Sequence, residues 1–127
     1  MLEIGKSKFK IWDKTHKKMF YYPDCGVVAL QNLFSLSNLN DLVVMQFTGT
    51  TDGEKDVFEG DIVDFEDDSL GLAIVVLREG CFLFKFLNGR KKGYETCIKD
   101  WNFKDCFFSV IGNVFENPEL LKEKESD

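Results

Sequence analysis

The carboxylates around the tripeptide Glu59-Gly60-Asp61 are the side chains whose spacing first suggests chemistry. Together with Asp64 they could form a pair for acid–base work or a cation site. Hydrolysis by two carboxylates requires both to face one cleft at a fixed separation, whereas a strand sends Glu59 and Asp61 to one face and Asp64 to the other. The pattern therefore favours a structural role, in which Gly60 supplies a backbone conformation that other residues resist and Asp61 accepts hydrogen bonds from nearby backbone N–H groups.

The remaining metal-ligating and nucleophilic side chains match no known catalytic pattern. The acidic run that ends at Asp68 lacks the alternating oxygen ligands, central glycine and later glutamate of an EF-hand. His16 is the single histidine and has no evident nucleophile beside it. Phosphate-binding, dinucleotide-binding and G-x-S-x-G motifs are absent. We therefore expect a protein that is not an enzyme and that needs no cofactor.

The four cysteines are spaced too widely for a zinc site, because none belongs to a C-x-x-C pair. In a cytoplasmic protein we expect them to be reduced. Cys81, Cys97 and Cys106 lie in apolar segments, where we expect small buried thiols. The four are Cys25, Cys81, Cys97 and Cys106.

Charge is unevenly distributed along the chain. Residues 1–22 hold six lysines against two acids, a net of +4, and residues 52–68 hold nine acids against Lys55, a net of −8. The formal net charge of −6 argues against a dominant nucleic-acid footprint. Either these patches face each other within one chain, or a basic face on one copy meets an acidic face on the next. The second alternative predicts a homo-oligomer.

Two basic clusters keep nucleic-acid binding open as an alternative function, since aromatic side chains among basic residues on a β surface can bind single strands. A second alternative is an acidic inhibitor of a host enzyme, suggested by the −8 segment. The predicted nucleic-acid contacts are Lys8, Lys10, Trp12 and Lys14 in an N-terminal hairpin, and Arg90, Lys91 and Lys92 in a later loop.

Apolar residues repeat with a period of two along most of the chain, which predicts strands. The strongest strand is predicted over residues 81–87, where Phe82, Phe84 and Phe86 share one face that must point into the core. Asn88-Gly89 predicts the turn of a hairpin directly after it.

Seven or eight short strands separated by turns predict an all-β protein, either a pseudo-barrel or a two-sheet sandwich. Residues 27–41 fit a helical stripe and in part also a strand, and their length favours a short helix or an irregular excursion equally. Asn117 can cap a short C-terminal helix that has Pro118 at its first position. We expect a single domain over residues 1–127, because the chain has no linker and a typical domain length. Without a signal segment or an apolar run of ~18–20 residues, we expect a cytoplasmic protein with no membrane contact.

Three blocks of the chain resemble the YopX-like proteins of bacteriophages and prophages, in the order and spacing of that family. The blocks are KFKIWDKTHKKMFYYPD, MQFTGTTDGEKDVFEGDIV and VIGNVFENPELL. The match carries over to residues that we expect to set the fold or form an interface: Trp12, Asp13, Gly49, Glu59, Gly60, Asp61, Gly112, Asn113, Glu116, Asn117 and Pro118.

The resemblance implies an all-β pseudo-barrel of two packed sheets, in agreement with the strand pattern. It implies no activity, cofactor or catalytic residue. A phage origin would place the protein in the cytoplasm of the host bacterium. We therefore expect a non-catalytic interaction module that self-associates there, and any other partner would be a host or phage protein.

Overall fold

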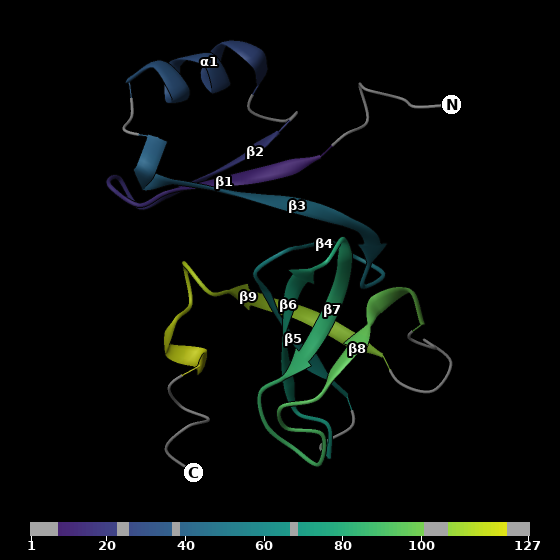
Figure 1. The fold of residues 1–127 in the computed structure, drawn as a ribbon. Coiled ribbons are helices and arrows are strands. Elements are labelled where there is room, and N and C mark those ends of the chain that lie inside the picture. Colours follow the sequence, from purple (N-terminus) through teal and green to yellow (C-terminus); the bar gives the residue numbers. More distant parts are fainter. Residues whose placement is uncertain (1–7, 23–25, 37–38, 67–68, 101–106, 122–127) are drawn as a thin grey trace, which may run out of the picture. The chain divides into compact units, whose positions relative to one another are not determined.

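The computed structural model describes residues 8–22, 26–36, 39–66, 69–100 and 107–121 (Figure 1). Strands make up most of it, and they form two antiparallel sheets, which confirms the predicted all-β class. Contacts divide the chain into two compact units, Met1–Phe47 and Thr48–Asp127. The single domain expected from the sequence stays a prediction. No helix in the described part of the chain is long and apolar enough to cross a membrane.

The first unit is built around strand β1, which pairs on both sides and is buried along most of its length. The predicted N-terminal hairpin is confirmed, since β1 and β2 are antiparallel and joined by a turn over residues 14–17. The elements of this part are β1 (Phe9–Asp13), β2 (Lys18–Tyr22), α1 (Gly26–Leu36), the 3₁₀ turn η2 (Leu39–Asp41) and β3 (Leu42–Thr51), whose last residues enter the second unit.

Helix α1 resolves the ambiguity of residues 27–41 in favour of a short helix, followed by η2. Within its own unit, the helix lies over one face of the sheet (Figure 1). Leu33 is buried, whereas Val28 is exposed, as expected for a helix with one face on a sheet. Packing of this face adds to the weak intrinsic preference of an 11-residue segment, which is too short to be a stable helix alone.

The second unit contains a five-stranded antiparallel sheet in the order β8-β7-β6-β5-β9. Strand β9, the last of the described strands, pairs with β5 and is one of the two edge strands of this sheet. Strand β4 completes the first sheet by pairing with β3. The elements are β4 (Asp56–Phe58), β5 (Asp61–Phe65), β6 (Leu72–Arg78), β7 (Cys81–Phe86), β8 (Glu95–Cys97), η3 (Ile98–Asp100) and β9 (Phe108–Asn113).

The core of the second unit is aromatic, as the sequence predicts. Phe84 and Phe86 are fully buried, and Phe82 is partly buried against the same cluster at the margin of the row. The ring of Phe65 lies 5.3 Å from each of the rings of Phe84 and Phe86, and Phe84 lies 5.1 Å from Phe108. These separations are those of favourable aromatic pairs, so β5, β7 and β9 are held together from one side by ring packing.

Two hairpin loops extend from β7. The β6–β7 turn places Glu79 (φ 50°) and Gly80 (φ 77°) consecutively in the left-handed region, as a two-residue hairpin turn requires. The predicted loop at Asn88-Gly89 does connect antiparallel strands, β7 and β8. The Asn88 side chain accepts a hydrogen bond from the backbone N–H of Leu72 at 2.8 Å, which ties this loop to the start of β6.

Candidate functional site

The Glu59-Gly60-Asp61 turn joins β4 to β5, and the described contacts of Gly60 and Asp61 are with the backbone. Gly60 has a φ of 89°, where other residues are strained, and its N–H donates to the Val75 carbonyl at 2.8 Å. The buried carboxylate of Asp61 accepts the Phe58 N–H at 2.8 Å. Asp64 is exposed, so it shares no cleft with Asp61.

The third block of the resemblance forms a turn after β9, and the side chains of this turn hydrogen-bond to its own backbone. The Asn113 side-chain oxygen accepts the N–H groups of Phe115 (3.1 Å) and Glu116 (2.8 Å), and its amide nitrogen donates to the Glu116 carboxylate at 2.8 Å. The Asn117 side-chain oxygen accepts the Asn113 N–H at 3.2 Å. A Cβ on Gly112 would lie 2.4 Å from that Asn117 oxygen, so a larger residue there would displace the Asn117 side chain.

Asn117 differs from its predicted role in detail. Its side chain accepts a hydrogen bond from the Asn113 N–H and so does not cap the helical turn. The Leu120 N–H donates to the backbone carbonyl of Asn117 at 3.1 Å. Residues 119–121 begin the helical turn expected after Pro118. The rest of the predicted C-terminal helix lies outside the described residues.

These two turns meet at one end of the β5–β9 pair. Asp61 is the register partner of Asn113, and the Val114 N–H donates to the Gly60 carbonyl at 3.0 Å. Most of the polar groups of both turns are therefore occupied by hydrogen bonds that shape the backbone. The fold-setting interpretation of Glu59 to Asp61 and of Gly112 to Asn117 accounts for this arrangement.

Asp13 likewise accepts backbone N–H groups, at the tip of the N-terminal hairpin. Its buried carboxylate accepts the N–H groups of Thr15 (3.1 Å) and His16 (3.3 Å) and lies 2.8 Å from His16 Nδ1. Burial alone would raise the pKa of Asp13, but the hydrogen bonds from His16, its charge when protonated, and the Thr15 N–H outweigh this and hold the pKa below its usual value. The neighbouring Trp12 is buried as well, with 8% of its surface exposed.

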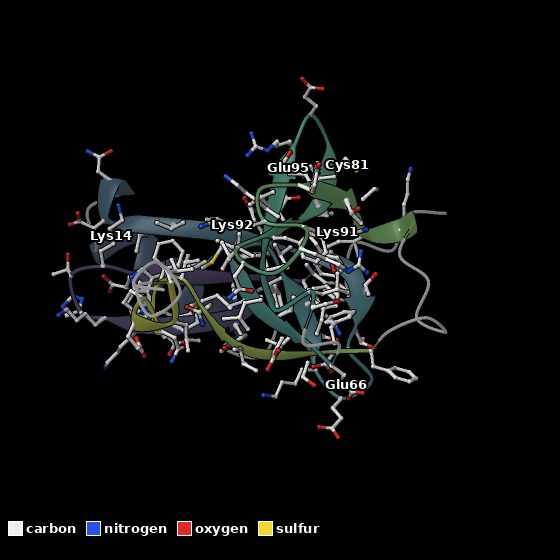
Figure 2. All side chains as sticks on the ribbon, turned by 90° about the horizontal axis from the view of Figure 1, so that it is seen from below. Lys14, Glu66, Cys81, Lys91, Lys92 and Glu95 are labelled. Carbon is white, nitrogen blue, oxygen red and sulfur yellow. The ribbon has the colours of Figure 1, made fainter. Side chains whose placement is uncertain are left out.

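The predicted nucleic-acid contacts are not all accessible. Lys10 is 3% exposed, so it and Trp12 present almost no surface. Lys8 is exposed and its ammonium lies 5.1 Å from the centre of the Phe47 ring. The remaining predicted contacts differ in exposure: Lys14, Arg90 and Lys92 are exposed and Lys91 is half-buried, with the side chains of Lys14, Lys91 and Lys92 labelled in Figure 2.

An unpredicted contact joins the acidic turn after β3 to the free edge of β9. Asp52 accepts the N–H groups of Glu54 (2.8 Å) and Lys55 (2.7 Å) with one oxygen and the Val110 N–H (2.8 Å) with the other. The Lys55 ammonium donates to the Val110 carbonyl at 3.4 Å. Both backbone polar groups of Val110 are thus satisfied by charged side chains where a neighbouring strand would otherwise pair. We call Asp52, Lys55 and Val110 the edge clamp.

The pKa of Asp52 reflects the same contacts. Burial alone would raise it, but the hydrogen bonds from Val110, Lys55 and Glu54 and the nearby Lys55 charge outweigh that effect and hold the pKa below its usual value. The carboxylate therefore stays ionised well into the acidic range. Asp52 and Val110 are 58 residues apart in the sequence, and no local sequence pattern indicates their contact.

Exposed apolar side chains lie beside the edge clamp. Phe107 is 59% exposed and Ile111 is 40% exposed. A shallow pocket of about 260 Å³ adjoins Phe107, and Glu66, which also lines it, projects outward (Figure 2). We call Phe107, Ile111 and the edge clamp together the β9 edge surface, and it is the candidate functional site of the second unit.

Cys81 and Cys97 form a second unpredicted cluster. Their sulfurs lie 2.9 Å apart and both thiols are half-buried and unbridged. A hairpin with its turn at Asn88-Gly89 pairs residues that lie at similar distances before and after the turn. This pairing would have predicted from the sequence that Cys81 and Cys97 lie near each other. The other cysteines, Cys25 and Cys106, lie outside the described residues.

The fold and its turns define an antiparallel all-β protein without a recognised catalytic constellation among the described residues. A family model described as YopX protein matches residues 25–122, most of the chain. The chain therefore belongs to the YopX protein family. The second and third blocks of the resemblance lie inside the matched range, and the first, residues 8–24, precedes it. No curated protein matches the chain.

Proposed function

We propose that this YopX-family protein is a non-catalytic interaction module that self-associates through the β9 edge surface. The observation that carries the proposal is the pair of exposed apolar residues, Phe107 and Ile111, in and directly before the edge strand β9. A free edge is the part of a sheet that most readily pairs with another chain. The family resemblance to phage and prophage proteins supports a site of action in the bacterial cytoplasm.

The edge clamp gives the association a specific form. Asp52 and Lys55 occupy the hydrogen-bonding positions of Val110 and so oppose open-ended strand addition. The exposed apolar side chains beside the clamp offer surface that can pack against a second copy. Because patches of opposite charge guide two surfaces into register, the −8 segment can meet the lysine-rich N-terminal segment of a second copy.

Three of the carboxylates that could serve in catalysis support the non-catalytic part of the proposal. Asp13, Asp52 and Asp61 each accept backbone N–H groups. The lowered pKa values of Asp13 and Asp52 are the reverse of what a general acid needs near neutral pH. Among the described residues, no group of three or more His, Cys, Asp or Glu side chains is placed to hold a metal ion.

Size-exclusion chromatography with light scattering tests this proposal over a range of protein and salt concentrations. We expect wild type to exceed the monomer mass and Phe107→Ser to shift toward the monomer. Tyr94→Ser is the matched control, because Tyr94 is also an exposed aromatic residue of this unit (67%) but lies beside β8. A strict monomer under every condition would contradict self-association, and equal dissociation of both variants would contradict the β9 edge surface.

Nucleic-acid binding is a second candidate, favoured by one observation. The loop after β7 presents exposed Arg90 and Lys92 close in sequence to exposed Tyr94, a combination of charge and aromatic surface that suits single strands. Fluorescence anisotropy with single-stranded oligonucleotides should then show binding at low salt that falls steeply as salt rises. Absence of binding at low salt would end this idea.

A further inference from the structure

We propose that Cys81 and Cys97 are a redox modification site, at which an oxidant of the peroxide class joins β7 to β8 by an intrachain disulfide. The proposal is independent of self-association. It rests on the placement of the two thiols and on the chemistry of closely spaced sulfurs.

The strand register brings the two cysteines together. In the β7–β8 pair, Leu83 is the partner of Cys97 and Lys85 is the partner of Glu95. Cys97 therefore lies diagonally across from Cys81, at the point where β8 ends and the chain turns into η3. The two sulfurs are 2.9 Å apart, so they need to close by only roughly 0.9 Å to reach the S–S bond length of ~2.05 Å.

The site is accessible to a small oxidant. Both thiols are half-buried and lie beside the β6–β7 turn, whose residues 78–80 are exposed. Arg78 is the register partner of Cys81, and its guanidinium pairs with the Glu95 carboxylate at 2.8 Å. Figure 2 shows Cys81 and Glu95 on the same part of the second unit. A charged, solvent-facing border of this kind admits water and peroxide, whereas a fully buried thiol is inert.

The reaction with hydrogen peroxide balances as follows. One thiolate attacks the O–O bond of hydrogen peroxide and becomes a sulfenic acid, and the oxygen that leaves takes up the thiol proton and departs as water. The second thiol attacks the sulfenic sulfur, forms the S–S bond and releases a second water. Two thiols have then lost two protons and two electrons, and these have converted one peroxide into two waters. A nearby resolving thiol is the feature that makes such oxidation reversible and selective.

The disulfide would act on a short edge strand of this sheet. Strand β8 has three residues and lies at the other free edge, so thermal opening of this edge should begin there. A bond from Cys81 to Cys97 closes the loop that carries Arg90, Lys92 and Tyr94. In a reducing cytoplasm, disulfides are mostly transient and regulatory, so oxidation would switch this loop between a freer and a more restrained state.

Intact-mass analysis and peptide mapping test the proposal on the full chain. After reduced protein is treated with hydrogen peroxide and free thiols are alkylated, we expect the loss of two hydrogens and a peptide in which Cys81 is joined to Cys97. Oxidation should also raise the melting temperature by on the order of 5–10 °C. Both changes should vanish in Cys81→Ser and in Cys97→Ser and persist in the matched control Cys106→Ser.

Three results would overturn the proposal. They are addition of oxygen without loss of hydrogens, a disulfide that involves another cysteine or a second chain, and unaltered thiols under peroxide concentrations that oxidise the unfolded protein. Peptide mapping of the wild type alone decides among these outcomes if a serine variant does not fold.

Discussion

Removal of the Asp52 carboxylate should release the acidic turn from the edge of β9. In Asp52→Ala the N–H groups of Glu54, Lys55 and Val110 all lose their acceptor. The first two belong to exposed residues, so water replaces the carboxylate at little cost. The Val110 N–H is partly buried and bonds across 58 residues, so this bond carries most of the effect.

The size of the effect follows from that difference. A hydrogen bond to a charged group contributes about 1.5–3 kcal/mol, and the two exposed bonds add a few tenths. We therefore expect Asp52→Ala to lose about 2 kcal/mol of stability, which lowers the urea midpoint by roughly 1.3 M for an m-value of about 1.5 kcal/mol/M. Asp52→Asn keeps an oxygen for one set of partners only and should lose about half as much.

Equilibrium urea unfolding and amide hydrogen exchange measure this directly. Glu54→Ala is the control, because it removes the same charge from the same turn while the Val110 bond remains. If Asp52→Ala matched Glu54→Ala in midpoint, and the Val110 amide exchanged no faster than in wild type, the reasoning about the edge clamp would be refuted.

Three further predictions rest on single features of the structure. Gly112→Ala should lose about 1–3 kcal/mol in urea unfolding, because its Cβ overlaps the Asn117 oxygen, and an unchanged midpoint would mean that this turn adapts. Phe84→Ala should lose about 3–5 kcal/mol, and Phe82→Ala should lose less because Phe82 lies at the core margin; a larger loss at Phe82 would contradict the placement of the core. The Asp52 carboxylate stabilises the fold at every pH above its unfolded pKa near 3.8, and this contribution is lost as the pH falls through the lower folded-state pKa. The stability gap between wild type and Asp52→Ala should therefore close in acid and stay constant from pH 5 to 7, as pH-dependent unfolding would show.

Local chemistry was enough to predict much of the fold. The alternation of Phe82, Phe84 and Phe86 identified a strand and its buried face, because a period of two leaves one face for the core. The left-handed backbone of Gly60 and the hydrogen bond from the Phe58 N–H to Asp61 could be anticipated from the sequence, because both depend on residues only a few positions away.

Contacts between distant segments could not be predicted in the same way. The Asp52–Val110 bond depends on β9 pairing with β5, which no neighbouring residue specifies. Lys10 looked like an exposed basic residue, yet β1 is the inner strand of its sheet and both of its faces are covered. Side-chain accessibility in such a strand is set by tertiary packing. The alternation of lysine with apolar residues therefore does not predict which lysine side chains are exposed.

Hydrogen exchange of the wild-type protein at low and high concentration tests the central claim most directly. If the chain self-associates through the β9 edge surface, amides of residues 107–113 become more protected as concentration rises, while those of the loop around Tyr94 do not change. Unchanged protection of residues 107–113 at concentrations where light scattering detects an oligomer would contradict the assignment of this surface, and absence of any oligomer would contradict self-association itself.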